Sequence, residues 1–369
     1  MDKYGKDTVL GCFSGICEKT EQRVRSAIAR WEDGTAEAEG FLDNDGADLD
    51  KPVRLHVRVT KEKDQLVFDF SKSDPQTKGP VNLRPFSAKA CCYYALIATI
   101  DRTIPNNDGL HRSIEARFSD RSVLNPSVPA PTSCYAQTYI LLTQVVLGAL
   151  LRLTGKKAIG AGASGGALVI GGRGTRSGEP YAHFELFFGG SGASSGDNGG
   201  HGQGTRNSFR GIKVAPAEII ESEFNVRMTR FDMERDSGGA GKFRGGLSPV
   251  RSYKILGEEG RLSLRSDGFV SAPWGVDGGL SGKTGEGIVV NPETGKERKV
   301  NARVADEVLL PGEIFTLKSG GGGGVGSPLE RDRKKVVEDL EDGYISVQAA
   351  QEIYGMTREE IEEIRKNLY

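Results

Sequence analysis

The chain has 369 residues, of which 49 are basic and 50 acidic, so its net charge is −1. This even mixture predicts neither a nucleic-acid-binding surface nor a charged disordered tail, and we expect no nucleic-acid partner. Glycine contributes 51 residues, about twice its usual share, and it clusters without the three-residue repeat of collagen.

The sequence also argues against export and membrane insertion. No basic stretch leading into an apolar one follows Met1, so no signal peptide is predicted. The longest apolar stretch, residues 139–153, contains Gln144 and Arg152 and is too short to span a bilayer. The five cysteines are odd in number and lack metal-ligand spacing, which is typical of reduced thiols. We therefore expect a cytoplasmic protein without a membrane segment.

The first part of the chain shows both helical and strand periodicity. Apolar residues at i, i+4 and i+7 predict a helix over residues 18–31. Apolar residues alternate with charged ones over 53–59 and again over 66–70, on either side of a turn at 61–64. This pattern is typical of a β-hairpin.

Two later segments, residues 87–100 and 134–153, predict helices that are apolar on nearly all sides. Such helices belong inside a large core. We therefore expect Leu147→Asp, which would bury an unpaired charge, to abolish soluble expression.

From about Gly160 onward, short strands separated by glycine-rich turns predict a β-rich region. Strands are expected over residues 181–188, 226–233, 249–256 and 261–264. Three helices should end the chain, the last opening with a capping box of Thr357 and Glu360. The predicted fold class is α+β, a β-rich mixed core with two buried apolar helices and a C-terminal helical segment. We expect it to divide into residues 1–158, 159–318 and 319–369.

A run of five glycines, residues 320–324, separates the β-rich part from the last helices. Five residues without a Cβ are poor helix or strand interiors, because each loses much backbone entropy on ordering. The flanking sequence resembles a buried strand on one side and a helix start on the other. We interpret the run as a bend where backbone passes close to another chain, a ligand or a packed helix; a plain hinge is the alternative.

Two short motifs overlap in residues 160–166. Gly160-Ala161-Gly162-Ala163-Ser164-Gly165 matches the dinucleotide fingerprint, and Gly162-x-Ser164-x-Gly166 resembles a nucleophile elbow. Both motifs require a strand, a turn and then a helix, whereas the apolar residues 167–172 predict a strand. Ser164 is therefore a minor candidate nucleophile.

The richest polar loop, residues 189–207, follows a predicted strand. Long loops in compact domains are functional or disordered, so a mobile surface loop is the alternative to a site. Successive glycine N–H groups can bind an anion, while acidic, imidazole and guanidinium groups can transfer protons or orient a substrate. The candidate site residues are Gly189, Gly190, Gly192, Asp197, His201, Arg206 and Asn207.

The four histidines are scattered and give no spacing for a metal pair. His56 lies on the charged face of a predicted strand, so we expect it to be solvated. His183 shares a strand face with Glu185, which is more typical of a satisfied core residue than of a metal ligand.

Several blocks, taken in order, resemble the B component of the hydantoinase/oxoprolinase family. This family includes ATP-dependent N-methylhydantoinases, 5-oxoprolinases, and acetone and acetophenone carboxylases. The most specific blocks are Asp43-Asn44-Asp45-Gly46, Asp236-Ser237-Gly238-Gly239-Ala240-Gly241-Lys242-Phe243-Arg244-Gly245-Gly246 and Pro273-Trp274-Gly275-Val276-Asp277-Gly278-Gly279. Others are residues 21–28, 33–35, 69–71, 79–82, 107–110, 125–126, 147–150, 216–221, 320–324, 328–332, 342–343 and 354–355.

The resemblance implies a partnership. ATP is bound by an A-type subunit, which activates the substrate by phosphoryl transfer. The B-type subunit then completes ring opening or, in the ketone carboxylases, carboxylation. A hetero-oligomer with a hydantoinase A-type subunit is expected. Asp236–Gly246 is interpreted as a structural turn with positive φ at its glycines, and Arg244 is placed at a subunit interface.

The chain departs from the family pattern at its start. The family's B-type subunits begin with a His- and Asp-rich region that carries the metal ligands, whereas this sequence starts just upstream of the helix at residue 18. We therefore expect a C-terminal portion of a family member, with any divalent metal held through the missing region. Cys134 stands where the family has Arg or another polar residue.

The resulting hypothesis is a B-type subunit that opens a small cyclic amide, hydantoin or 5-oxoproline. Gly189, Gly190 and Gly192 would stabilise negative charge through backbone N–H groups. Asp197 and His201 would orient the substrate or transfer protons, and Arg206 with Asn207 would contact an anion. The alternatives are a subunit of an acetone- or acetophenone-type carboxylase and a non-catalytic assembly fragment.

Overall fold

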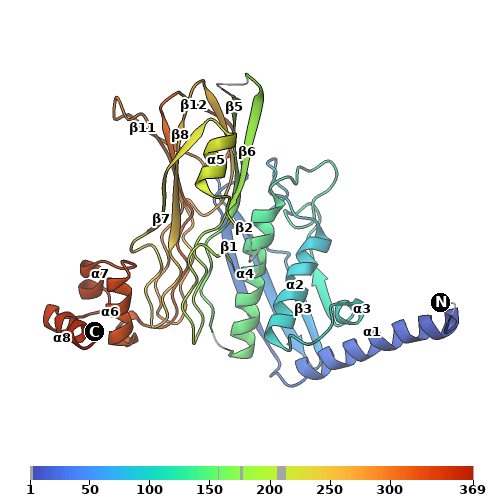
Figure 1. Cartoon of the computed structure of the whole chain (residues 1–369). Coiled ribbons are helices and arrows are strands. Elements are labelled where there is room, and N and C mark those ends of the chain that lie inside the picture. Colours follow the sequence, from blue (N-terminus) through green and yellow to red (C-terminus); the bar gives the residue numbers. More distant parts are fainter. Residues whose placement is uncertain (1–2, 157, 175–177, 206–212, 369) are drawn as a thin grey trace. The chain divides into compact units, whose positions relative to one another are not determined.

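The structure is a computed structural model that describes residues 3–156, 158–174, 178–205 and 213–368. The chain forms two compact units, Met1–Lys156 and Lys157–Tyr369. Each unit contains both helices and sheets, which confirms the predicted α+β class (Figure 1).

The first unit is a four-stranded sheet in the order β1-β2-β3-β4, antiparallel except for the parallel pair β3–β4. Helix α4 packs on β1 and β2, and α2 lies beside α4 (Figure 1). The elements are α1 (Lys6–Ile28), β1 (Gly34–Leu42), β2 (Val53–Glu62), β3 (Gln65–Asp69), α2 (Pro85–Thr99), α3 (Asp108–His111), β4 (Ile114–Arg117) and α4 (Tyr135–Thr154).

Strands β2 and β3 form the hairpin that the alternating pattern predicts. Strand β1 was not predicted, because its core face carries small residues in place of large apolar ones. A Cβ on Gly40 would lie 2.9 Å from the side chains of both Leu141 and Val145. Small residues on β1 therefore allow α4 to approach the sheet closely.

Helix α4 is longer than the apolar stretch that predicted it. It has 20 residues and is, by length and composition, the one helix in the described part of the chain that could cross a membrane. The prediction that this segment is too short to span a bilayer is therefore wrong. Half of its apolar window is buried inside the first unit, so contacts with α2, β1 and β2 account for its apolar character without a bilayer.

The structure changes which residue of α4 best tests its burial. Leu147 is only partly buried, whereas Val146 and Leu150 are fully buried. We expect Val146→Asp to remove soluble expression, because it places an unpaired carboxylate in the core. Leu147→Asp is the matched control and should remain soluble, contrary to the expectation from sequence. Comparable soluble yields for the two variants would contradict the orientation of α4.

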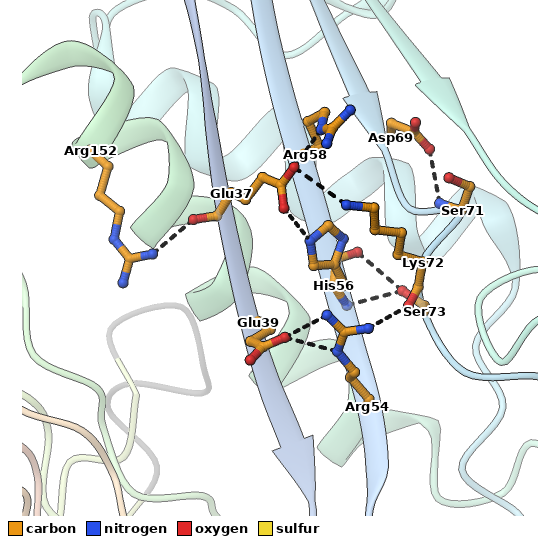
Figure 2. A network of polar contacts seen from close by, with 10 residues as sticks. All are labelled: Glu37, Glu39, Arg54, His56, Arg58, Asp69, Ser71, Lys72, Ser73 and Arg152. Carbon is orange, nitrogen blue, oxygen red and sulfur yellow. Dashed lines mark hydrogen bonds and ion pairs between the residues drawn. The ribbon is translucent and has the colours of Figure 1, made fainter.

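The outer face of the sheet carries a polar network centred on Glu37 of β1 (Figure 2). His56 of β2 is 3% exposed, and its Nε2 lies 3.0 Å from Glu37 Oε2. The backbone N–H of His56 donates to Ser73 Oγ at 3.0 Å. The expectation that His56 is solvated is therefore wrong. Ser73 bonds to the backbone N–H and C=O of His56, and Lys72 Nζ lies 3.6 Å from Glu37 (Figure 2).

The network lowers the pKa of Glu37 to about 2, chiefly through hydrogen bonds from Arg58 and then His56. A depressed carboxyl pKa stabilises the folded state above the unfolded pKa, and this contribution is lost as pH falls through the folded pKa. We therefore expect NMR titration of Glu37 to give a midpoint near 2. Arg58→Gln should move that midpoint toward the ordinary value of 4.5, and an unchanged midpoint would contradict the assignment.

The second unit contains two antiparallel sheets that share one core. Their orders are β11-β10-β13-β8-β7 and β12-β9-β5-β6, and buried side chains from both sheets form one cluster around Tyr253, Phe187 and Phe315. All four strands predicted between residues 181 and 264 are present. The elements are β5 (Gly166–Arg173), β6 (Pro180–Phe187), α5 (Ala217–Glu223), β7 (Val226–Glu234), β8 (Ser248–Ile255), β9 (Gly260–Arg265), β10 (Glu286–Val290), β11 (Glu297–Val300), β12 (Arg303–Leu309) and β13 (Ile314–Lys318).

The five-glycine run lies at the centre of a bundle of extended, glycine-rich segments. The N–H groups of Gly321 and Gly324 both donate to one neighbouring segment, at Lys283 and Leu280. Gly322 donates to Gly246 and Gly323 to Ala161, in two other segments. Hydrogen bonds that return to the same neighbour every third residue are expected of polyproline II geometry, which has three residues per turn and no internal hydrogen bonds.

Close backbone approach, and not a bend, explains why these positions are glycine. A Cβ on Gly322 would lie 2.0 Å from the carbonyl oxygen of Ser191, and one on Gly323 would lie 2.0 Å from that of Trp274. Within the run, positive φ occurs only at its first residue, Gly320 (86°), and it occurs again at Gly326 (74°), two residues after the run. The predicted close approach is thus made to other segments of the same chain.

The same reason corrects the interpretation of residues 236–246. Positive φ in this segment falls on Asp236 (58°) and not on its glycines. A Cβ on Gly245 would lie 1.9 Å from the carbonyl oxygen of Gly322. The glycines of this block therefore serve bundle packing.

The C-terminal helices form a small core together with Ala240 of the glycine-rich block. Thr357 N–H donates to Glu360 at 2.7 Å, and Glu360 N–H donates to Thr357 Oγ1 at 3.1 Å, which confirms the predicted capping box. The elements are η1 (Pro328–Glu330), α6 (Arg333–Glu341), α7 (Val347–Glu352) and α8 (Arg358–Leu368).

Candidate functional site

An open hollow of ≈ 420 Å³ lies on the surface of the second unit, where four segments of the glycine bundle meet. Two of the segments belong to the blocks around Lys242 and Asp277, the third is the end of the glycine run, and the fourth is the turn at Ser195 and Gly196. The hollow is lined by Ser195, Gly196, Lys242, Phe243, Asp277, Val325 and Gly326.

Backbone hydrogen bonds fix these segments against one another. Val325 and Phe243 exchange two N–H···O bonds of 2.9 Å. Gly326 N–H donates to Val276 at 3.1 Å, and Lys242 N–H donates to Gly326 at 3.1 Å. The backbone that carries the polar side chains of the hollow is therefore preorganised.

The hollow combines a cation with a carboxylate. Lys242 Nζ lies 3.4 Å from Glu330 in an exposed ion pair, which a competing anion can displace. Asp277 has a φ of 53°, a conformation that is strained for a residue with a side chain. Ser195 donates to Ala158 at 3.4 Å. Such a set can bind a carboxylate or phosphoryl oxygen at Lys242 and accept a proton at Asp277.

Asp197, a predicted site residue, lies directly beside this hollow. It follows the lining residue Gly196 and is exposed. Ser194 and Asp197 exchange backbone N–H···O bonds of 2.9 and 3.1 Å, which close a tight turn. The carboxylate is thus presented at the surface on a fixed backbone.

His201, the other predicted acid–base residue, is half-buried and held by its Nδ1. This atom accepts the N–H of Leu247 at 2.9 Å, so the neutral ring carries its proton on Nε2. Burial lowers the pKa of His201, and the charge of Arg244 lowers it further. This geometry favours hydrogen-bond donation from Nε2–H over proton abstraction.

The predicted substrate-binding glycines lie inside the bundle. Gly189, Gly190 and Gly192 are all buried, and Gly190 N–H already donates to Gly320 at 2.9 Å. Their role toward a substrate stays a prediction. Arg206 and Asn207 lie outside the described residues.

Arg244 is 2% exposed and forms a two-point ion pair with Asp339, with both N···O distances 3.1 Å. Its placement at a subunit interface is therefore wrong. Arg331 Nη2 lies 2.7 Å from the same carboxylate, and Arg331 Nη1 donates to Asn198 at 2.9 Å. These contacts attach helix α6 to the glycine-rich segment that carries Asp197 and His201.

The two motifs around Ser164 have no helix after them. Strand β5 follows directly, as predicted, so neither a dinucleotide fingerprint nor a nucleophile elbow is formed. Among the residues that the structure describes, no three His, Cys, Asp or Glu side chains are grouped to hold a metal ion.

Sequence reasoning missed Lys242 and Asp277 as site residues. Both lie in blocks that carried the family resemblance, but the block around Lys242 was interpreted as a structural turn and the block around Asp277 was given no role. Both are charged residues within glycine-rich blocks, where the glycines themselves serve backbone packing. A charged side chain in such a block could have been recognised as a candidate site residue.

The chain belongs to the hydantoinase B/oxoprolinase family, which matches residues 1–328. The B component of a putative D-/L-hydantoinase from Pseudomonas sp. is 29% identical over 374 residues, covering 99% of this chain and 62% of the relative. The acetophenone carboxylase delta subunit of Aromatoleum aromaticum is 25% identical, covering 96% of this chain and 57% of the relative.

The crystal structure of ATP-dependent caprolactamase from Pseudomonas jessenii shares the fold. Its TM-score is 0.83 at 21% identity, covering 99% of this chain and 65% of that chain. The chain therefore spans less than two thirds of the length of these relatives. By their names, the family's members include hydrolases and carboxylases.

Proposed function

We propose that the chain acts as a B-type subunit in an ATP-dependent hydrolase that opens a hydantoin or 5-oxoproline ring. The supporting observation is its 29% identity, across 99% of its length, to a relative named as the B component of a hydantoinase. In this proposal ATP is bound by a hydantoinase A-type subunit, and the hetero-oligomer works in the cytoplasm. A divalent metal would be held by the His- and Asp-rich region characteristic of the family.

The chemistry explains why two subunits are needed. Amide resonance makes an unactivated lactam slow to hydrolyse, so phosphorylation of its carbonyl oxygen supplies a better electrophile and a good leaving group. Lys242 supplies positive charge toward the anionic intermediate in the hollow. His201 Nε2–H donates a hydrogen bond, and Asp197 and Asp277 are the carboxylates available for proton transfer.

Co-expression with a hydantoinase A-type subunit tests the proposal. ADP release and product formation are measured with hydantoin, with 5-oxoproline, and with acetophenone plus bicarbonate. We expect ADP release that requires a cyclic amide and both chains. ATP-dependent carboxylation of acetophenone would instead support the carboxylase alternative.

Two further results would overturn the proposal. No turnover with any substrate, even with the family's N-terminal region supplied in trans, would identify an assembly fragment. Ring opening by this chain alone, without nucleotide, would remove the need for a partner.

The hollow is tested separately with Lys242→Ala in the active complex. Loss of a charged group at a developing anion lowers kcat/KM by roughly tenfold or more. Lys335→Ala, on the exposed face of α6, is the matched control and should leave kcat/KM unchanged. Equal activities of the two variants would place the reaction away from the hollow.

A further inference from the structure

A second pocket, of ≈ 340 Å³, lies in the first unit and is less open than the hollow. It forms where the loop between β1 and β2 meets the loop after β3. Its polar lining includes Asp48, Lys51, Asp74 and Lys78, and Pro75 contributes to an apolar wall. This pocket shares no residue with the hollow in the second unit.

The floor of the pocket is rigid. The buried Asp45 carboxylate accepts the N–H of Asp48 at 2.7 Å and that of Gly79 at 2.9 Å. A Cβ on Gly79 would lie 1.8 Å from the Asp45 carbonyl oxygen, so the two loops are in direct contact. Asn82, which is fully buried, donates to the carbonyls of Gly79 and Pro131 at 3.1 and 3.0 Å. The loops therefore hold the charged lining residues in place before any ligand binds.

Asp48, Lys51, Asp74 and Lys78 are the lining charges that a ligand can reach, whereas Asp45 is used within the floor. Within the described part of the chain, neither Lys51 nor Lys78 forms an ion pair. Asp74 accepts the N–H of Arg54 through one oxygen at 2.8 Å, which leaves its second oxygen available, and the Asp48 side chain is exposed. Two ammonium groups and three carboxylates, one of them the hydrogen-bonded Asp45 of the floor, thus line one small pocket.

This mixture of charges selects the ligand. A simple anion would meet the carboxylates of Asp48 and Asp74 as well as that of Asp45, and a simple cation would meet Lys51 and Lys78, so each would be repelled by part of the lining. A zwitterion pairs with both sets. The volume lies at the small end of ligand pockets, roughly 300–1,000 Å³, and the wall at Pro75 suits an aliphatic group. We infer that the pocket binds a zwitterionic α-amino acid with an aliphatic side chain.

Calorimetry on the full chain with L-leucine tests this inference. The matched ligands are 4-methylpentanoate, which lacks the amino group, and 3-methylbutylamine, which lacks the carboxylate. We expect leucine to bind saturably and each analogue to bind about tenfold more weakly or worse, because each loses a charge-assisted contact. Binding of either analogue as tightly as leucine would overturn the inference, as would absence of leucine binding at millimolar concentration.

Variants locate the binding. Lys51→Ala combined with Lys78→Ala should raise the Kd for leucine at least about tenfold, and Asp48→Asn should raise it as well. Lys89→Ala, an exposed lysine on α2, is the control, and circular dichroism checks that each variant is folded. Leucine binding unchanged in the double variant would overturn the inference. No ATP or A-type subunit is needed, so this result is independent of the proposed catalytic role.

Discussion

Gly322→Ala is expected to prevent the second unit from folding. The added methyl carbon would lie 2.0 Å from the carbonyl oxygen of Ser191 and 2.8 Å from Gly192 N. Both are backbone atoms of the bundle, so no side chain can rotate away to make room. We expect a loss above about 4 kcal/mol in the free energy of unfolding, which belongs to the severe end of single substitutions. Soluble yield and urea denaturation followed by circular dichroism measure this loss.

Gly148→Ala is the matched control, because it makes the same chemical change inside α4. Apart from its chain neighbours and the backbone of α4 itself, no described atom lies within 4 Å of the added methyl carbon there, and alanine is favoured over glycine in a helix by about 0.5–1 kcal/mol. We expect this variant to be as stable as the parent chain or slightly more so. If Gly322→Ala had the same melting temperature as Gly148→Ala, the segments of the glycine bundle would not pack as closely as described.

Asp339→Ala is expected to have the second largest effect. Asp339 is 6% exposed and receives the guanidinium groups of Arg244 and Arg331, which are 2% and 3% exposed. Its removal leaves two buried cations without their carboxylate, a change that costs about 3–5 kcal/mol. Because Arg331 also bonds Asn198, the glycine-rich segment beside the hollow should loosen. Thermal unfolding and amide hydrogen exchange of residues 194–204 measure the two consequences.

Asp342→Ala is the control for Asp339→Ala, because it removes an aspartate near the same end of α6. Asp342 is exposed at the C-cap of α6, and surface substitutions of this kind stay within about 0.5 kcal/mol. A similar melting temperature for the two aspartate variants would show that the paired arginines do not depend on Asp339.

The elements with strong local periodicity were predicted correctly. The β2–β3 hairpin, helices α2 and α4, and the Thr357–Glu360 capping box depend on neighbours within a few residues, so the sequence pattern contains the information that forms them. Strand β1 was missed because α4 requires small residues on it. His56 was misplaced because its partners come from other segments: Glu37 pairs with its ring, and Ser73 bonds to its backbone.

In the candidate site, too, local sequence pointed to some residues, and others were revealed only by contacts between distant segments. Asp197 and His201 were recognised by residue type in a glycine-rich loop, and whether they act in catalysis stays a prediction. Lys242 and Asp277 were not recognised, because only the bundle brings their segments to the end of the glycine run. Arg244 was assigned to an interface because Asp339, its partner, is 95 residues away.

By itself, the sequence determined the fold class, the family and the positions of the periodic elements, since these depend on composition, order and local spacing. Only the tertiary structure decided why the five glycines are needed and which charged groups share a pocket. Polyproline II segments form no internal hydrogen bonds, so their partners must come from elsewhere in the chain. No local pattern around residue 320 can therefore name Ala161, Gly246 and Lys283 as the acceptors.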